Sequence, residues 1–290
     1  MLRKMPRLIT FLPLALLLAI CAHGAELRAP AQVKAGSAFS LSSNGSGEAT
    51  LYLVGPASVS KHKVELGSGI PVKADEIEHA GRYVAIVCSG GDCSSANFYV
   101  VASDAGKLSL LVHPSRVRVA TPNAISAVAF VFDRFHNLVL TPTDVEFRVI
   151  PQQGAPLTHS QPSSNGVAWV RMTSATKEGP TKIGAAVAGA SELRVVRQVA
   201  SDACNLRIKS EWVSGKLYVQ TDPVRDCGGN NVPDGTVVSF TKTDEAGKTT
   251  VDAPIKRGIA RVEMPVSGQA RIDVASGVVT GNELNVAGAR

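Results

Sequence analysis

The chain has 290 residues, of which 44% are hydrophobic and 19% charged, with a formal net charge of +6 at pH 7. This length is sufficient for two or three domains. The charge balance does not match the strongly basic profile of nucleic-acid-binding proteins, so that class of partner is excluded. Glycine and proline are frequent and dispersed, as expected for a protein of many short strands joined by turns.

The first 25 residues have the pattern of a secretory signal peptide. Arg3, Lys4 and Arg7 form a basic start and account for three of the six net positive charges. An almost wholly apolar run follows, and Ala22 and Gly24 are the small residues that a signal peptidase requires. We therefore expect export, with cleavage after Gly24 or Ala25.

Two other fates of this segment stay open. Its apolar run of about 15 residues is short for a bilayer span, but an uncleaved segment would act as an anchor. The sequence Leu-Ala-Ile-Cys ending at Cys21 also resembles a lipobox, the acylation signal of bacterial lipoproteins, although Ile20 stands where a small residue is usual. After residue 25 we expect no membrane-spanning helix.

Residues 26–103 alternate between strand and turn patterns. The expected strands are 26–35, 37–41, 49–54, 81–87 and 97–101. Cys88 and Cys93 bracket a tight turn between the last two, so they should face each other across a hairpin. We predict a disulfide bond between them.

Residues 104–201 also contain about seven strands. The clearest are 107–113, 117–120, 124–132, 167–173, 182–187 and 193–199, of which 124–132 is the most apolar. We expect 154–165 to be a polar loop. Residues 201–203 form a short link to the next domain.

Residues 202–290 give seven further strand candidates: 206–211, 216–221, 237–243, 249–251, 259–264, 270–275 and 281–286. Removal of the signal leaves four cysteines, an even number that suits an oxidising compartment. We predict a second bridge, Cys204–Cys227, worth about 3 kcal/mol against about 2 kcal/mol for the shorter Cys88–Cys93 loop. Free thiols or zinc are the alternatives, and zinc is disfavoured because the chain has no histidine pair at ligand spacing.

One stretch of the chain occurs twice, 92 or 93 residues apart, which is about the length of one β-sandwich domain. The matching positions are Asp133/Asp226, Asn137/Asn230, Val139/Val232, Thr143/Thr236, Val145/Val238 and Phe147/Phe240. Downstream, Gly-Val-Ala-Trp-Val-Arg-Met (166–172) matches Gly-Ile-Ala-Arg-Val-Glu-Met (258–264). Residues 81–87, Gly-Arg-Tyr-Val-Ala-Ile-Val, look like a third, more divergent copy of this glycine-led strand. The repeat predicts that the same sandwich fold occurs twice in the chain, so the repeated residues should have a structural rather than a catalytic role.

The repeated stretch is similar to the bacterial immunoglobulin-like repeats of the invasin and intimin type. Those repeats carry an Asp, a Gly-Asn-Pro-Val loop and a Val-x-Phe strand, followed by a Gly-x-Ala-x-Val strand. The resemblance covers 104–200 and 202–290, with Leu138 and Asn231 in place of the usual proline and His136 in place of a glycine. It implies an immunoglobulin-like fold, with cell-surface interaction as a possible role alongside that of a spacer.

Candidate catalytic groups are not convincing. Ser-x-x-Lys occurs at Ser58/Lys61, Ser60/Lys63, Ser174/Lys177 and Ser239/Lys242, and so many matches without partner motifs indicate chance. His62, His79, His113, His136 and His159 form no metal-binding motif and are expected at the surface. We therefore predict a non-enzymatic protein without catalytic residues, metal or cofactor.

The loop from Asp222 to Asp234 is the candidate calcium site, because its carboxylates and amides are hard oxygen ligands. However, Asp226 and Asn230 belong to the repeated motif, and in such loops these side chains more often bond to turn backbone. Turn capping is therefore the favoured interpretation.

Two further groups of residues are candidate binding residues. Arg116, Arg118, Arg194 and Arg197 make the middle domain basic and suit an anionic glycan or lipopolysaccharide, although charged edge strands that resist aggregation explain them as well. Trp169 lies in a predicted strand, and Trp212 lies at the end of one. Trp169 alternates with valines, so we expect it in the core rather than on a sugar-binding surface.

The sequence thus predicts an all-β protein: three tandem immunoglobulin-like sandwiches (26–103, 104–201 and 202–290) after a signal peptide (1–25). We expect it in the periplasm, at the cell surface or outside the cell, as a non-catalytic binding or spacer module with a protein or glycan partner. The alternative is a periplasmic assembly factor or chaperone that uses a sheet edge. The ligand-binding residues and the oligomeric state stay open.

Overall fold

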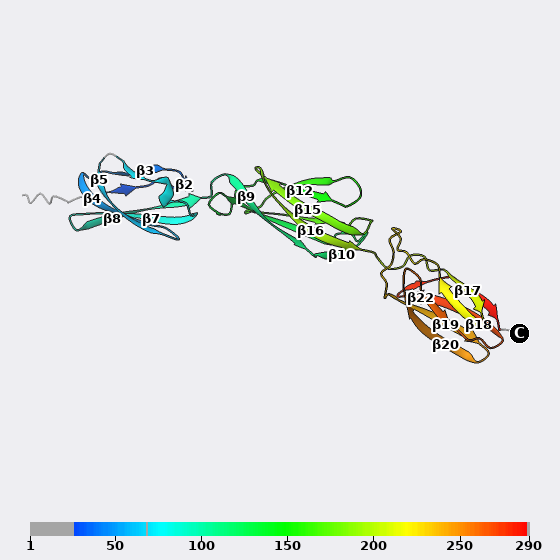
Figure 1. Ribbon diagram of the computed structural model, residues 1–290. Helices are drawn as coiled ribbons and strands as arrows, with labels where there is room; N and C mark the ends of the chain where they lie inside the picture. The colour runs from blue at the N-terminus through cyan, green and yellow to red at the C-terminus, as the bar shows by residue number, and fades with distance from the viewer. Residues whose placement is uncertain (1–25, 68, 289–290) are drawn as a thin grey trace, which may run out of the picture. The chain divides into compact units, whose positions relative to one another are not determined.

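The computed structural model describes residues 26–67 and 69–288. The predicted signal peptide, including Cys21, lies outside these residues. The described chain consists of strands and loops with one short 3-10 helix, η1 (Ala74–Glu76) (Figure 1). Its helices include none that is long and apolar enough to cross a membrane. The chain divides into two compact units, the first ending at Val101 and the second beginning at Ala102.

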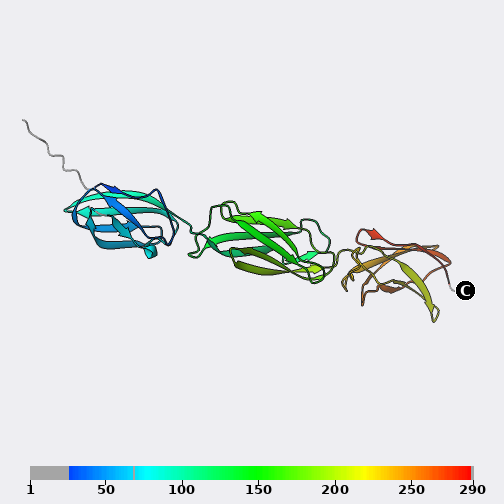
Figure 2. The same cartoon turned by 90° about the horizontal axis from the view of Figure 1, so that it is seen from above.

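The first unit is a sandwich of two sheets, coloured blue to cyan in Figures 1 and 2. One sheet has the order β1-β3-β6 and the other β2-β8-β7-β4-β5. The strands are β1 (Leu27–Arg28), β2 (Gln32–Lys34), β3 (Phe39–Ser43), β4 (Gly47–Val54), β5 (Val59–Leu66), β6 (Ile70–Val72), β7 (Gly81–Ser89) and β8 (Asp92–Val101). Apolar residues at every second position put Leu51, Leu53 and Tyr83 into the core between the sheets.

The second unit contains two separate cores, and the first of them lies in a sandwich coloured green in Figure 2. Its sheets have the orders β14-β11-β9 and β10-β16-β15-β12-β13. The strands are β9 (Ala105–His113), β10 (Arg116–Arg118), β11 (Ile125–Asp133), β12 (Asp144–Ile150), β13 (Leu157–Pro162), β14 (Val167–Met172), β15 (Gly179–Val187) and β16 (Ala190–Val199). Val145 and Phe147 of the repeated motif are buried here.

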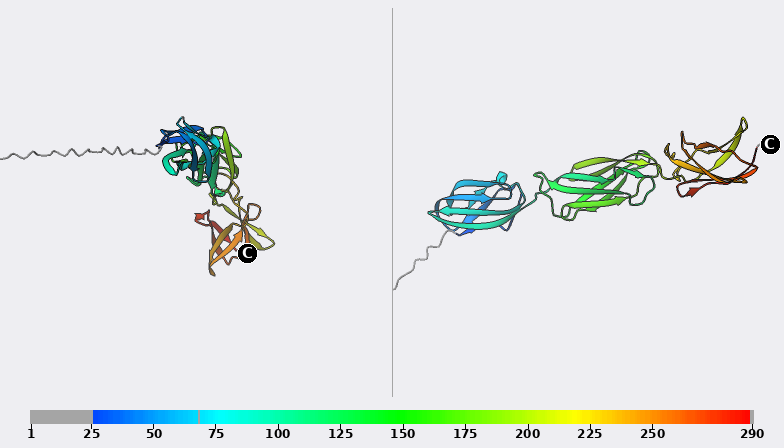
Figure 3. Two further views of the ribbon diagram at one scale, coloured as in Figure 1. Left: turned by 90° about the vertical axis from the view of Figure 1, so that its left-hand side faces the viewer. Right: turned by 90° about the horizontal axis from the view of Figure 1, so that it is seen from below.

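The other core of the second unit lies in a sandwich coloured yellow to red in Figure 3. One sheet has the order β17-β18-β21, and in the other β20-β19-β22 is extended by β23 and β24, which both pair with β22. The strands are β17 (Ile208–Val213), β18 (Lys216–Thr221), β19 (Val237–Asp244), β20 (Gly247–Pro254), β21 (Arg261–Glu263), β22 (Gln269–Ser276), β23 (Val279–Thr280) and β24 (Leu284–Ala287). Val238 and Phe240 are buried, as their counterparts Val145 and Phe147 are.

The same strand order recurs in the three sandwiches. Strands β1 to β8 pair in the same pattern as β9 to β16, including the parallel pairs β2–β8 and β10–β16. In the third sandwich β17, β18 and β21 correspond to β9, β11 and β14, while β19, β20 and β22 correspond to β12, β13 and β15. The prediction of an all-β chain of tandem immunoglobulin-like sandwiches is therefore confirmed.

The prediction that residues 81–87 are the third copy of the glycine-led strand is wrong. These residues form β7, which lies in the five-stranded sheet at the position of β15. The counterpart of β14 is instead β6, which follows Gly69 (φ 87°). A glycine turn followed by alternating apolar residues is found in both sheets of a sandwich, so this pattern does not identify the sheet.

Three predicted elements differ from the structure in detail. The entry strand 26–35 is split at Pro30 into β1 and β2, which join different sheets. The predicted loop 154–165 contains β13, whose side chains are almost all exposed, so no apolar alternation marks it. The last predicted strand, 281–286, is replaced by the two short strands β23 and β24.

Candidate functional site

The first copy of the repeated motif forms a closed loop around Asp133, at the end of β11. The Asp133 carboxylate accepts hydrogen bonds from the backbone N–H groups of Phe135 (2.9 Å) and Asn137 (2.8 Å) and from the Asn137 side chain (2.9 Å). It also accepts one from the backbone N–H of Ser103, 30 residues earlier (2.9 Å). Asp133 is fully buried. Its carboxylate therefore binds its own turn and the chain that enters the sandwich.

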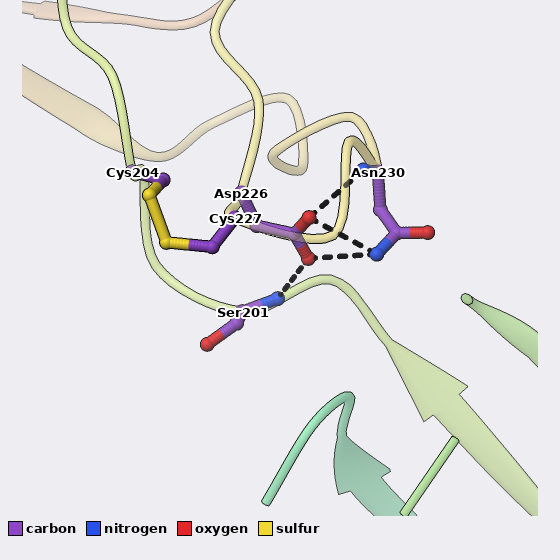
Figure 4. The surroundings of a disulfide bond; sticks show 5 residues. All are labelled: Ser201, Cys204, Asp226, Cys227 and Asn230. Atoms are coloured by element: carbon purple, nitrogen blue, oxygen red, sulfur yellow. Dashed lines mark hydrogen bonds between the residues drawn. A yellow bond between two sulfur atoms is a disulfide. The ribbon is translucent and has the colours of Figure 1, made fainter. Parts of the chain in front are cut away.

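The second copy repeats this geometry around Asp226, as Figure 4 shows. The Asp226 carboxylate accepts hydrogen bonds from the Asn230 backbone (2.8 Å), the Asn230 side chain (2.9 Å) and the backbone N–H of Ser201 (2.9 Å). The Asn230 side chain in turn donates to the Thr176 carbonyl (2.9 Å) and accepts from the Glu178 N–H (3.0 Å). The loop between β14 and β15 is thereby joined to the motif loop of the following sandwich.

Both carboxylates are held in their charged form. Burial opposes ionisation of Asp226, but the hydrogen bonds from Ser201, Asn230 and Gly228 outweigh it, and its pKa lies below the ordinary value for aspartate. In the same way, burial is outweighed at Asp133 by the bonds from Asn137, Ser103 and Phe135, which lower its pKa. A lowered pKa disfavours a role in proton transfer near neutral pH.

The backbone of the two loops matches as well. The third residue after each aspartate has a left-handed conformation, with φ 69° at His136 and φ 77° at Gly229. The N–H of each bonds back to the aspartate carbonyl, at 3.1 and 3.0 Å. The loop therefore needs a residue in the left-handed region, which explains the glycine of the second copy.

The first sandwich has a simpler version of this contact. The Asn44 side chain, directly after β3, accepts a hydrogen bond from the backbone N–H of Glu26 (2.5 Å). Strand β3 corresponds to β11 and β18, so in each sandwich a carboxylate or amide at the end of this strand or after it binds the entering chain. Ser103 and Ser201 were not identified from the sequence, because their backbone carries the contact.

Both pairs of cysteines form disulfide bonds. Cys88 and Cys93 lie opposite each other on β7 and β8, and Cys204 is bonded to Cys227. Cys227 directly follows Asp226, so the second bridge and the aspartate fasten the same loop to the entering chain (Figure 4). This arrangement stabilises the start of the third sandwich.

The oxygen atoms of the Asp222–Asp234 loop bind mainly the protein's own groups. Asp226 is occupied as described, Asp234 accepts from the backbone of Arg257 (2.9 Å) and Gly258 (3.2 Å), and Asp222 lies 3.4 Å from Lys209. The turn-capping interpretation therefore describes this loop. In the described ranges no group of three or more acidic, histidine or cysteine residues has a metal-binding arrangement.

Three of the four serines in the Ser-x-x-Lys matches have side-chain partners other than the lysine. Ser174 bonds to the backbone of Arg118 (2.6 Å) and Thr121 (2.8 Å), whereas Lys177 reaches the Gly228 carbonyl (2.5 Å). Ser60 donates to Glu76 (2.7 Å), and Ser239 donates to Asp252 (2.5 Å). None of these three serines is placed as a nucleophile activated by its lysine.

The histidines and arginines are distributed over the surface. His62 contacts Glu76, and His136 lies 3.1 Å from Lys107. Arg118 pairs with Asp202 (2.7 Å) and Arg194 with Glu192 (2.8 Å). Arg116 and Arg197 lie opposite each other on β10 and β16, exposed to solvent. The four arginines are thus partly neutralised by neighbouring acids.

The expectation that Trp169 is a core residue is wrong. Its neighbours Ala168 and Val170 point into the core, so the alternation of the strand turns Trp169 outward, where it is 60% exposed. Trp212 on β17 is 43% exposed. The second copy of the repeat could have predicted this exposure. Arg261 stands at the position of Trp169 when residues 258–264 are aligned with 166–172, and an arginine at that position indicates a solvent-facing site.

No family model matches the sequence, and no curated protein matches it. The structure is similar to FdeC, an adhesin of Escherichia coli, with a TM-score of 0.61 and 13% identity over 92% of this chain and 97% of that one. InvD of Yersinia pseudotuberculosis also matches, with a TM-score of 0.46 and 13% identity over 90% of this chain and 96% of InvD. The bacterial integrin-binding protein invasin gives a TM-score of 0.45 and 13% identity over 92% of this chain and 60% of invasin. At such identities the likeness is one of fold, and the chain has the tandem immunoglobulin-like architecture found in a bacterial adhesin.

Proposed function

We propose that the chain is an exported, non-catalytic repeat protein that acts as a binding or spacer module at the bacterial cell envelope or surface. The observation that carries this proposal is the use of the repeated motif. In both copies the buried Asp accepts hydrogen bonds from turn and linker backbone, and the side chain of the buried Asn donates to that Asp, so these buried polar groups are used for architecture. Export is supported by the basic and apolar start of the sequence and by the two disulfide bonds.

The adhesin-like architecture supports a place at the envelope. A module of this kind presents sheet faces, edges and loops to a partner while its cores carry no chemistry. The partner is a protein or a glycan, and the domain boundaries near 103/104 and 201/202 belong to the same proposal.

Expression of the full chain with a C-terminal tag tests the proposal. We expect the mature protein to begin at Ala25 or Glu26 by mass spectrometry and to be recovered from the envelope or medium with both disulfides formed. A chain that keeps residues 1–25 and stays in the cytoplasm would contradict the proposal. An acylated Cys21 would support a lipid-anchored form of the same module.

One observation favours a second candidate, an assembly factor that pairs with a strand of its client. Strand β13 is the edge of its five-stranded sheet, is exposed along most of its length and carries no Asp, Glu, Lys or Arg. Such an edge is open to an added strand. Leu157→Lys together with Ser160→Lys would abolish a stoichiometric complex with an envelope subunit, whereas Thr249→Lys on the edge strand β20 would not. A complex that survives the β13 changes would count against strand addition there.

A further inference from the structure

The outer face of the β14-β11-β9 sheet carries an apolar surface. The register places Leu111, Val128 and Trp169 in one row across the three strands, and Ser109, Phe130 and Val167 in the next. We call these six residues the Trp169 face. Trp169 and Leu111 are the most exposed of them, at 60% and 58%. The face therefore presents an aromatic ring beside a strip of aliphatic carbon.

The orientation of this face is fixed by the core beneath it. The residues between its members, among them Leu110, Ala129 and Ala168, are buried in the sandwich. A one-residue slip would exchange the two faces and bring Trp169 into the core in place of alanine and valine. Trp169 is therefore held outward by the packing of the whole sheet, on a rigid element.

Positive charge lies beside the Trp169 face, and no acid neutralises it. The next row of the sheet is His113, Ser126 and Arg171. None of the outward positions of β9, β11 and β14 is an Asp or a Glu. Among the described residues, Arg171 has no ion pair or side-chain hydrogen bond. Its guanidinium is available for an external carboxylate, which it can bind in a bidentate manner.

The third sandwich shows that the scaffold does not require such a face. There the corresponding face is charged and neutralises itself: Arg261 replaces Trp169 and lies over the Tyr218 ring, 4.4 Å from its centre. Arg261 also lies 4.0 Å from Glu211, and Lys216 pairs with Glu263 at 3.0 Å. The same architecture is thus built with a paired, polar face, which leaves the Trp169 face without a structural explanation.

We propose that the Trp169 face binds an acidic saccharide. The apolar side of a sugar ring stacks on the Trp169 indole, the hydroxyls of Ser109 and Ser126 bond to sugar hydroxyls, and Arg171 binds the sugar carboxylate. The size of this surface favours a saccharide over a protein, because a stable protein interface takes roughly 20–30 residues a side, whereas the six residues of the Trp169 face and the three of the adjoining row make nine. The inference rests on the proposed function, since it names the partner class of the proposed binding module.

Titration of the full chain with acidic oligosaccharides tests the inference. The Trp212→Phe variant leaves Trp169 as the single tryptophan, and its fluorescence is followed with hexamers of galacturonate, hyaluronan and α2,8-linked sialic acid. We expect at least one of them to change the Trp169 emission in a saturable manner. Trp169→Ala, read by calorimetry, should weaken that binding about tenfold or more, and Arg171→Gln should remove the preference over a neutral hexasaccharide.

Matched variants make the result specific. Arg261→Ala at the equivalent position and the Arg116→Ala/Arg197→Ala pair on the other sheet should leave the affinity unchanged. The inference is wrong if none of the three acidic probes binds at about 1 mM, if Trp169→Ala binds as the wild type does, or if Trp169→Ala abolishes only the capture of a protein partner. In those cases a processed, envelope-located chain would still support the proposed function, whereas a cytoplasmic chain would contradict it whatever the saccharide result.

Discussion

The Asp226 carboxylate accepts a hydrogen bond of 2.9 Å from the backbone N–H of Ser201, which lies 25 residues earlier in the chain. Asp133 makes the same contact with Ser103, also at 2.9 Å. In the second sandwich the aspartate is the last residue of β11, and in the third it lies five residues beyond the end of β18 at Thr221. In both, the serine precedes the first strand of the three-stranded sheet. The repeated motif therefore holds the start of the second and third sandwiches against their own motif loops.

Replacement of Asp226 by asparagine should destabilise the third sandwich. The neutral side chain has the same shape, but its amide group would face the N–H donors of Ser201 and Asn230 and leave some of them unsatisfied. We expect a loss of about 2 kcal/mol in the free energy of unfolding, measured by urea denaturation. Asp222→Asn is the control, because its exposed ion pair with Lys209 should contribute less than about 1 kcal/mol. Equal losses in both variants would refute the role of Asp226.

The contribution of Asp226 should depend on pH with a definite sign. Its pKa is lowered in the folded state, so the folded chain binds fewer protons than the unfolded chain in acid. The stabilisation is complete above the ordinary aspartate pKa of about 4 and is lost as the pH falls through the lowered native value. The stability difference between the wild type and Asp226→Asn, followed in acid, should therefore shrink. A difference that grew with acidification would contradict this assignment.

The two disulfide bonds should contribute unequally. The Cys204–Cys227 bond closes a sequence separation of 23 and the Cys88–Cys93 bond one of 5. The chain-entropy model gives about 3 and about 2 kcal/mol for loops of these lengths. Double alanine substitution of Cys204 and Cys227 should lower the unfolding midpoint of the third sandwich. Double alanine substitution of Cys88 and Cys93 should lower the unfolding midpoint of the first sandwich. Thiol labelling of the unreduced, denatured wild type should find no free cysteine among the four.

The left-handed position of the motif loop is occupied by His136 in one copy and by Gly229 in the other, so opposite substitutions can be tested at the two sites. His136→Gly should stabilise the second sandwich, and Gly229→Ala should destabilise the third, each by about 1 kcal/mol, because a residue with a Cβ is disfavoured at these φ values. A Cβ at Gly229 would have only Lys177 Nζ within 4 Å, at 3.7 Å, so the cost is one of backbone conformation. Thermal unfolding of both variants checks this, and shifts of the same sign would be inconsistent with it.

The sequence predicted the architecture well where one physical pattern determines it. The period of two in Val145 and Phe147 predicts a half-buried strand, and the repeat at about ninety residues predicts a second sandwich. The spacing of Cys88 and Cys93 around a turn predicts their bond, and the structure contains it. In each case the signal is local or is duplicated in the chain.

The sequence failed where the outcome depends on the choice of sheet face or sheet. Trp169 and its valine neighbours fit a strand in either register, and only the packing of Ala168 and Val170 settles which face is buried. Strand β13 was not predicted from the sequence because its side chains are exposed on both faces and its apolar residues do not alternate. The contacts of Ser103 and Ser201 are made by backbone, and side-chain identity therefore does not predict them.

Amide hydrogen exchange at Ser103 and Ser201 reports the two linker hydrogen bonds themselves, and therefore shows whether the repeated aspartates hold the entering chain. We expect slow exchange at both amides in the wild type. Asp226→Asn should accelerate exchange at Ser201 and leave Ser103 protected, and Asp133→Asn should do the reverse. Fast exchange at Ser201 in the wild type, or protection that persists in Asp226→Asn, would show that the repeated aspartate does not fasten the entering chain.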